Sequence, residues 1–205
     1  MQSPVRFLAP LFLSIACVGA AAPADLFRAE RAPTHAIWVD TLDITRMQQR
    51  RGLPRGGRSI RDQPIVLGGV TYPRGIGTRS ISEFVIDLDG QAERFASVVG
   101  FDDAIEPGVG SVTFEVWADD TLVAESGLMR VGDAPKTLSA DLKGARVLTL
   151  LVDDGGDTSN DDEVAWAGAH IVLVPNATAK PRPYDSPPEP PPAIAPLRKL
   201  PQPEI

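Results

Sequence analysis

The stretch YPRGIGTRSISEFVIDLDG, residues 72–90, joins a glycine-rich segment to a run of alternating apolar residues. A Gly-x-Gly sequence can bind phosphate when a helix follows it, because the first amide N–H groups of the helix and its dipole then face the anion. Here the apolar residues from Phe84 to Leu88 recur at a spacing of two, which is the period of a strand. We therefore predict that Gly75 and Gly77 supply permissive backbone angles, or room for close backbone approach, at the entrance of a strand.

Similar alternation recurs through the middle of the chain. The alternating segments are residues 36–40, 83–88, 94–102, 111–119, 121–129, 136–142, 146–154 and 164–175. Many short strands separated by turns indicate an all-β fold, a sandwich or a barrel. The residues predicted to be buried in its core are Val112, Phe114, Val116, Leu148, Leu150 and Trp166. One short helix is predicted, over residues 42–52.

The N-terminus has the pattern of a targeting segment. Arg6 precedes an apolar run over residues 7–22, which predicts a secretory signal peptide over residues 1–24, followed by a short leader over residues 25–33. The run is short for a membrane span. We therefore expect a secreted or periplasmic protein without membrane insertion.

The lone cysteine and the prolines bound the folded domain. Cys17 is the only cysteine, so disulfides are not expected to stabilise the mature chain, and a lipid anchor on Cys17 is the alternative to plain secretion. From residue 175 onward the chain carries 11 of its 20 prolines, which predicts a Pro-rich linker or tail over residues 175–205. Residues 34–174 remain for one sandwich domain.

The overall charge is acidic, with one basic exception. The formal net charge is −7, which argues against a nucleic-acid partner. Residues 46–61, in contrast, contain six arginines and no acid. A cluster of this kind suits either a nucleic-acid patch or a solvated basic surface that acidic loops partly balance. Export and the acidic remainder favour the solvated surface.

Two further features bear on chemistry. An acidic stretch over residues 153–163 offers Asp153, Asp157 and Asp162 as calcium ligands, although its spacing is not that of an EF-hand and a solvated turn is the alternative. Trp166 suits either a sugar-stacking platform or a core position, and its alanine neighbours favour the core. No Gly-x-Ser-x-Gly elbow occurs, so we do not expect an enzyme, and no cofactor other than calcium is predicted.

Several motifs, in order, resemble the NPCBM family of carbohydrate-binding modules. The matching segments are WVDTLDITRMQQRRGLP from residue 38, LGGVTYPRGIGTRS from 67, FASVVGFDD from 95, GSVTFEVWADDTLVAESGLM from 110, LKGARVLTLLVDDGGD from 142 and DDEVAWAGAH from 161. Members of this family are attached to glycoside hydrolases, including bacterial α-galactosidases and family 98 enzymes. The resemblance runs from residue 38 to about residue 174.

This resemblance implies a fold, a ligand and a set of site residues. The family fold is a jelly-roll β-sandwich of the galactose-binding-domain-like type. The implied function is non-catalytic binding of galactose-containing or related glycans, with a glycoside hydrolase catalytic domain as a further partner. The residues that we expect to contact sugar are Trp38, Tyr72, Arg79, Asp102, Asp103, Asp162 and Glu163. We expect the exposed ring of Trp38, Tyr72 or Trp117 to stack on the sugar and the polar groups to bind its hydroxyls.

The chain also departs from the family pattern. Arg79 and Glu163 each stand where many members have histidine, and Ala165 and Gly168 stand where they have aspartate. Opposite charges at two motif positions suggest compensation, so we predict an ion pair between Arg79 and either Asp162 or Glu163. Two alternatives stay open: the chain is the accessory part or relic of an α-galactosidase-like hydrolase, or it is an interaction domain that has lost sugar binding.

Overall fold

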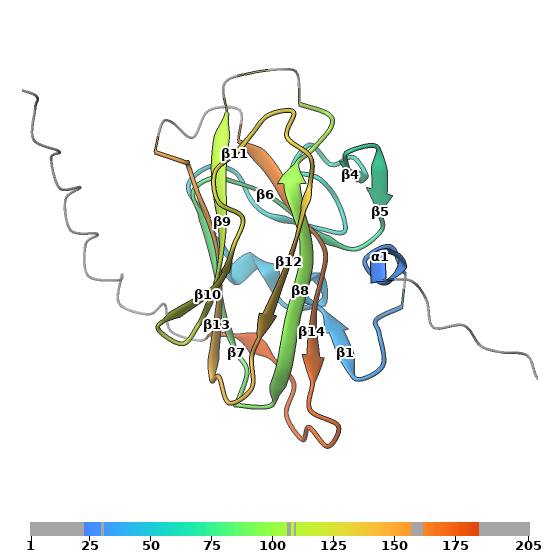
Figure 1. Ribbon diagram of the computed structural model, residues 1–205, viewed down its shortest axis with the longest axis vertical. Coiled ribbons are helices and arrows are strands. Elements are labelled where there is room, and N and C mark those ends of the chain that lie inside the picture. Colours follow the sequence, from blue (N-terminus) through green and yellow to red (C-terminus); the bar gives the residue numbers. More distant parts are fainter. Residues whose placement is uncertain (1–22, 30, 106–107, 109, 157–161, 185–205) are drawn as a thin grey trace, which may run out of the picture.

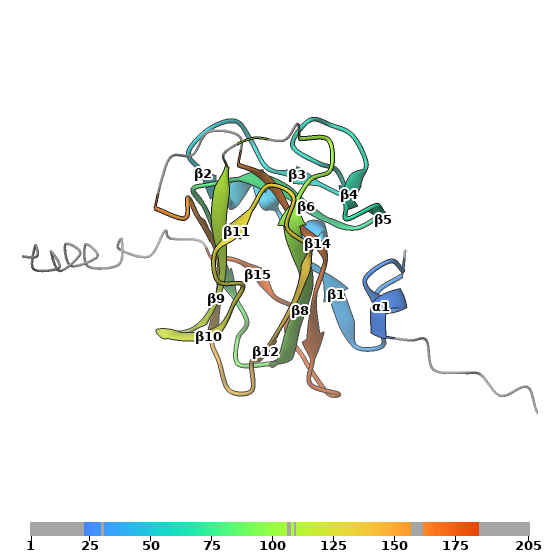
Figure 2. The ribbon, with the colours of Figure 1, turned by 45° about the horizontal axis from the view of Figure 1, so that its top comes forward.

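The computed structural model describes residues 23–29, 31–105, 108, 110–156 and 162–184. Their regular secondary structure is almost entirely β, with two large sheets lying face to face and a small hairpin beside them (Figures 1 and 2). Within this part of the chain the one α-helix is α1 (Pro23–Leu26). No helix among the described residues has the length and apolar character needed to cross a lipid bilayer. The all-β prediction is confirmed.

The first sheet has the strand order β12-β8-β14-β6-β3, with β1 also paired to β14. All of its pairs are antiparallel. Its strands are β1 (Ala36–Trp38), β3 (Arg55–Gly56), β6 (Gly75–Arg79), β8 (Ala92–Phe101), β12 (Lys136–Asp141) and β14 (Glu163–Leu173). Strand β14 lies in the middle of this sheet, and its first nine residues are buried.

The second sheet has the order β10-β9-β13-β7-β15, with β11 paired to β9 and β2 paired to β7. Its strands are β2 (Gln48–Gln49), β7 (Ser82–Asp87), β9 (Ser111–Ala118), β10 (Thr121–Glu125), β11 (Met129–Arg130), β13 (Val147–Asp153) and β15 (Arg182–Pro183). A separate hairpin joins β4 (Ile65–Leu67) to β5 (Val70–Tyr72).

The core lies between the two large sheets, because alternate residues of each strand point inward. All six residues predicted to be buried are at most 1% exposed. Trp166 of β14 contacts Phe95 of its own sheet and Phe114 of the opposite sheet, with ring centroids 5.9 Å and 5.0 Å away and both pairs edge to face. Trp166 is therefore a core residue that joins the sheets and is not a sugar platform.

The glycines of the 72–90 stretch allow close backbone approach, as predicted. A Cβ added at Gly75 would lie 2.4 Å from the carbonyl oxygen of Trp166, and one at Gly77 would lie 2.3 Å from the carbonyl oxygen of Arg58. Gly75 also has a φ of 132°, which side-chain-bearing residues rarely adopt. Strand β6 can therefore sit against both β14 and the segment around Ser59 only without side chains at these positions.

The predicted helix over residues 42–52 is wrong. This region forms two 3-10 turns, η1 (Val39–Thr41) and η2 (Ile44–Arg46), followed by strand β2. Asp43 caps η2 by accepting the backbone N–H of Thr45 at 3.2 Å. The next residues pair with the edge of β7. That sheet pairing overrides a weak local helix preference.

The predicted leader packs against β14. Residues 1–22 of the predicted signal peptide lie outside the described part of the chain. Phe27 is 8% exposed, and its backbone lies so close to β14 that a Cβ on Gly168 would be 2.4 Å from its carbonyl oxygen. The buried ring of His170 lies between Phe27, 5.6 Å away, and Trp38, 5.5 Å away. Burial is the main cause that lowers the pKa of His170, and the nearby charge of Arg94 acts in the same direction.

The segment predicted as a Pro-rich linker or tail makes defined contacts with the sandwich over residues 178–184. Strand β15 pairs with the outer edge of β7, and the N–H of Tyr184 donates to the carbonyl of Val85 at 3.0 Å. A proline is tolerated in β15 because an edge strand needs hydrogen-bond donors on one side only. The rest of the predicted tail lies outside the described residues.

Replacing Gly77 with alanine tests the close approach at β6. We expect Gly77→Ala to lower the free energy of unfolding by about 3 kcal/mol, because the new methyl group would overlap backbone atoms that cannot move independently. Gly100→Ala is the matched control, since its Cβ would make ordinary contacts of 3.4 Å or more. Urea denaturation of both variants measures the difference, and equal losses would contradict the interpretation.

The free energy of unfolding should decrease as the pH falls, because His170 is buried in its neutral form. The unfolded imidazole takes up a proton near its ordinary pKa of 6.5, whereas the buried ring resists it, so the stabilisation from neutral His170 is lost as the pH drops below that value. One such proton contributes at most about 1.4 kcal/mol per pH unit. We expect His170→Gln to show a shallower fall than the parent chain between about pH 7 and pH 5 in denaturant titrations. Parallel curves would rule out this role for His170.

Candidate functional site

The close approach at β6 places a second segment at one end of the sandwich. The N–H of Gly57 donates to the carbonyl of Gly75 at 2.7 Å, and the N–H of Gly77 donates to the carbonyl of Arg58 at 3.0 Å. These bonds and the pairing of β3 with β6 hold the first part of the segment 55–66 beside β6. The arginines of that segment therefore lie at the end of the sandwich where β14 begins.

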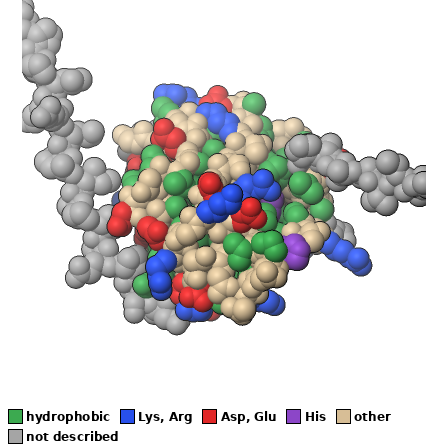
Figure 3. Space-filling model, turned by 60° about the horizontal axis from the view of Figure 1, so that its bottom comes forward, with side chains coloured by type: hydrophobic (Ala, Val, Ile, Leu, Met, Phe, Trp, Pro, Cys, Tyr) green, Lys and Arg blue, Asp and Glu red, His purple; other side chains and the backbone are tan. Residues whose placement is uncertain are grey.

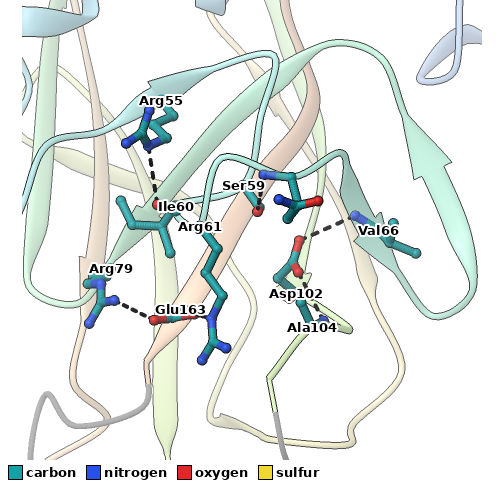
Figure 4. Close-up of polar contacts among 10 residues, drawn as sticks. Arg55, Ser59, Ile60, Arg61, Val66, Arg79, Asp102, Ala104 and Glu163 are labelled. Carbon is teal, nitrogen blue, oxygen red and sulfur yellow. Dashed lines mark hydrogen bonds and ion pairs between the residues drawn. The ribbon is translucent and has the colours of Figure 1, made fainter.

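The centre of this end is a buried carboxylate shared by two arginines. Glu163, the first residue of β14, lies opposite Arg79, the last residue of β6. Nη2 of Arg79 pairs with Oε1 of Glu163, and Nε of Arg61 pairs with Oε2 (Figure 4). The side chain of Glu163 is 7% exposed, compared with 31% for Arg79 and 50% for Arg61. The predicted ion pair between Arg79 and Glu163 is confirmed, whereas the second arginine was not predicted.

A pocket of about 500 Å³ opens beside Arg79. Its lining residues are Arg51, Gly52, Leu53, Arg55, Ile60 and Arg79. Pockets that hold small ligands have volumes of roughly 300–1,000 Å³. Within the described residues, only Nη2 of the Arg79 guanidinium has a partner, so its other N–H groups can donate to a ligand. The pocket thus combines directional donors with the apolar carbon atoms of Leu53 and Ile60.

Asp162 is part of the protein interior. It is 0% exposed, and its Oδ2 accepts a hydrogen bond from the hydroxyl of Ser80. Its backbone carbonyl also accepts the N–H of Ser80 at 3.3 Å. These contacts tie the start of β14 to the turn between β6 and β7. A side chain this deeply buried can influence a ligand only by positioning its neighbours.

Asp102 and Asp103 hold the β4–β5 hairpin in place. Asp102 accepts the backbone N–H of Val66 at 3.3 Å and that of Ala104 at 3.0 Å (Figure 4). Asp103 accepts the N–H groups of the two glycines in the β4–β5 turn at 2.8 Å and 2.6 Å. Burial raises the pKa of Asp102, while the N–H donors of Ala104 and Val66 oppose the increase. The contact of Asp102 and Asp103 with sugar stays a prediction. The hydrogen bonds that both carboxylates accept from backbone N–H groups have a structural role, since they hold the β4–β5 hairpin.

The prediction that Trp38 or Tyr72 offers an exposed ring is wrong. Trp38 is 4% exposed and packs edge to face against His170. Tyr72 is 7% exposed and belongs to a small cluster beneath the β4–β5 hairpin, together with Ile65. Both rings follow the general tendency of large aromatic side chains to pack into apolar interiors, and sequence spacing alone did not reveal those neighbours.

The predicted calcium site stays a prediction. Asp157 lies outside the described residues, and Asp162 is buried against Ser80. Oδ1 of Asp153 accepts the N–H of Asp154 at 2.8 Å, as in a solvated turn. Among the residues that the structure describes, no three acidic, histidine or cysteine side chains are grouped in a way that could hold a metal ion.

Sequence reasoning missed the pocket, although one signal for it was present. The sequence pattern of residues 46–61 favours a solvated basic surface and assigns no role to Leu53 and Ile60. The signal is these two apolar residues among arginines, and it is weak because single apolar residues are common on protein surfaces. Recognising it required the position of β6, which only the tertiary structure supplies.

Comparison with known proteins decides the family. The profile of the NPCBM/NEW2 domain matches residues 35–172. The chain belongs to the NPCBM/NEW2 family. The predicted resemblance is confirmed, and with it the assignment to a non-catalytic, carbohydrate-binding class of module.

Solved CBM51 modules and a curated protein are similar to this NPCBM/NEW2 chain. The CBM51 module of a Clostridium perfringens GH95 protein, solved in complex with methyl-galactose, is 30% identical with a TM-score of 0.62, and the match covers 66% of this chain and 99% of that one. CBM51-2 of Clostridium perfringens ZmpB, solved with GlcNAc and INT domains, is also 30% identical with a TM-score of 0.62, over 66% of this chain and 31% of that one. An alpha-1,3-galactosidase B of Akkermansia muciniphila is 30% identical over 166 residues, 76% of this chain and 21% of that protein.

This NPCBM/NEW2 chain is short beside its curated relatives. It spans 21% of the length of the Akkermansia muciniphila protein and 7% of a second curated relative, which is 33% identical over 109 residues. The similarity therefore concerns a module of those proteins and not their full length.

A double-mutant cycle tests the sharing of Glu163. We expect Arg61→Ala and Arg79→Ala each to lower the free energy of unfolding by about 0–1 kcal/mol, because the remaining arginine still pairs with the carboxylate. The double variant leaves a buried charge without either partner, so it should lose about 1–2 kcal/mol more than the two single losses together. Urea denaturation measures all three variants.

Glu163→Gln in the double-variant background is the control for this cycle. Removing the buried charge should recover most of the extra loss, because a neutral amide costs less to leave without an ionic partner. Additive single losses, or no recovery with glutamine, would show that Glu163 does not couple the two arginines.

Proposed function

We propose that this chain binds galactose-containing or related glycans, without catalysis, at the end of the sandwich where Arg79 lines the pocket. The observation that carries the proposal is a pocket of sugar size beside an arginine held by a buried carboxylate. The complex of a 30% identical CBM51 module with methyl-galactose supports the class of sugar. The positions of Arg79 and Glu163 in two family motifs support the location.

The binding mechanism follows from the chemistry of the pocket. The outward N–H groups of Arg79 donate to sugar hydroxyls, while Glu163 positions the guanidinium and lowers the entropy lost on binding. Leu53 and Ile60 offer apolar contact to the C–H face of the ring. Each polar contact replaces one with water, so we expect a dissociation constant of about 0.1–1 mM for a single sugar.

The remaining predicted site residues have supporting roles in this proposal. Asp102 and Asp103 fix the β4–β5 hairpin through backbone N–H groups, and Asp162 fixes the turn after β6. Trp38 and Tyr72 pack in the interior. These residues act on glycan binding only by holding the backbone around the pocket.

The setting of the module also belongs to this proposal. We infer that it acts beside a glycoside hydrolase catalytic domain, in the same chain or in another, and that it raises the local concentration of the enzyme at its glycan. The names of the relatives support such a partner, and the pattern of residues 1–24 supports export. We also assign the sandwich to the jelly-roll type, which the likeness to CBM51 modules supports.

One observation favours a second candidate, an interaction domain that has lost sugar binding. The described residues of the pocket lining include no aromatic side chain, and two of the three candidate stacking rings, those of Trp38 and Tyr72, are buried, while Trp117 is half-buried. Stacking on an aromatic ring is a frequent contribution to sugar binding. The second candidate predicts that no glycan binds.

A glycan array followed by calorimetry separates the two candidates. We expect the full chain to retain galactose-terminated glycans, and Arg79→Ala to weaken binding at least about tenfold without a large change in melting temperature. Arg94→Ala is the matched control, because this exposed arginine lies on β8 at the opposite end of the sandwich. Absence of binding to every glycan would favour the interaction domain, and undiminished binding by Arg79→Ala would place the sugar elsewhere.

A further inference from the structure

Among the described residues, the charged side chains that line the pocket are all arginines. Arg51, Arg55 and Arg79 contribute guanidinium groups, and no described carboxylate belongs to the lining. The described lining is thus positively charged, although the whole chain carries a formal net charge of −7. The opposite end of the sandwich differs, since Figure 3 shows acidic and basic side chains interspersed there. A concave surface with charge of one sign concentrates ligands of the opposite charge.

In the described part of the chain, two carboxylates near this pocket are each shared between two arginines. Asp62 lies 3.4 Å from Arg55 and 3.6 Å from Arg58, so it is shared between them. Glu163 is likewise shared between Arg61 and Arg79. Neither of the two lining arginines Arg55 and Arg79 therefore has a carboxylate to itself.

The two carboxylates also differ in how firmly they hold their arginines. Glu163 is buried and fixes Arg79 in one orientation. Asp62 is 58% exposed and Arg55 is 47% exposed, so their interaction is weakened by solvent. Nε of Arg55 donates to the carbonyl of Ile60 at 3.2 Å, which holds the guanidinium near the pocket (Figure 4). An incoming anion can thus compete with Asp62 for a guanidinium that is already in position.

We propose that the pocket lined by Arg51, Arg55 and Arg79 binds an anionic substituent of the glycan, the carboxylate of a sugar acid or a sulfate ester. This inference rests on the proposed function, and it names the class of glycan that the module prefers. A guanidinium offers paired N–H donors whose geometry matches two oxygens of a carboxylate or sulfate. Leu53 and Ile60 then contact the C–H groups of the ring that bears the anion.

The proposal excludes a neutral sugar as the preferred ligand on energetic grounds. Hydrogen bonds to charged groups contribute more to binding than those between neutral groups. A neutral galactoside offers Arg79 only hydroxyl acceptors, whereas an acidic one adds hydrogen bonds in which donor and acceptor are both charged. We therefore expect an acidic sugar to bind at least about tenfold more tightly than its neutral parent.

Matched sugars that differ at one carbon test the preference. The probes are methyl galactoside, methyl galacturonoside and methyl galactoside 6-sulfate, which carry a hydroxyl, a carboxylate and a sulfate ester at the same position. Lactose and 3′-sialyllactose form a second pair that places the anion on a neighbouring sugar. Calorimetry on the full chain measures each affinity, and sodium sulfate alone serves as the control for an anion without a sugar. The two acidic probes distinguish a carboxylate ligand from a sulfate ligand.

Salt dependence and variants assign the preference to this pocket. We expect the affinity for the acidic sugars to fall several-fold between about 50 mM and 500 mM sodium chloride, because salt screens charges that solvent reaches. Arg55→Ala and Arg51→Ala should reduce the ratio of acidic to neutral affinity to near one, and Arg55→Lys should restore part of it because charge is kept while the paired geometry is lost. Arg94→Ala should leave the ratio unchanged.

Each outcome has one meaning. Equal affinity for acidic and neutral sugars overturns this inference and leaves the proposed function standing. A preference for acidic sugars that persists in Arg55→Ala and Arg51→Ala also overturns it, because the anion then binds elsewhere. If none of the sugars binds to a folded chain, the proposed function fails and the inference fails with it. Circular dichroism and melting temperature confirm that each variant is folded.

Discussion

The close backbone approach at Gly75 and Gly77 is the constraint on which the rest of this structure depends. Strand β6 lies between β14 on one side and the segment around Arg58 on the other, and backbone atoms occupy the space that side chains would need. This contact completes the sheet that carries Trp166. It also places the arginines of residues 55–66 beside the start of β14. The same two glycines therefore serve both the core and the candidate site.

The electrostatics of the site follow from the burial of Glu163. A carboxylate that is almost removed from water is costly unless cations compensate it, and here Arg61 and Arg79 do so together. Pairing fixes the orientation of Arg79 while part of its guanidinium stays available to the pocket. A buried pair of this kind contributes more to the shape of a site than to the stability of the fold. The pair gives this small module a firmly oriented guanidinium, that of Arg79, which can donate hydrogen bonds to a ligand in the pocket.

Much of the fold could be predicted from periodicity, and part of the site from motif positions. The period of two assigned the inward residues of β9 and β13, because a strand has only two faces. The opposite charges at Arg79 and Glu163 predicted their contact. The helix over residues 42–52 was wrong because pairing with β7 outweighed local preference, and the contacts of residues 178–184 were missed because an edge strand accepts proline. The pocket was missed because it forms only where β6 brings Arg79 beside residues 51–60.

By itself, the sequence determined the all-β class, the six core positions and the family, since alternation and ordered motifs are local properties of the chain. The tertiary structure alone decided which polar and aromatic residues face a ligand. Trp38, Tyr72 and Asp162 looked available in the sequence but are buried, whereas Leu53 and Ile60 looked unremarkable and line the pocket. The physical reason is that exposure depends on which distant segments pack together, and here that packing is set by the backbone contacts of β6.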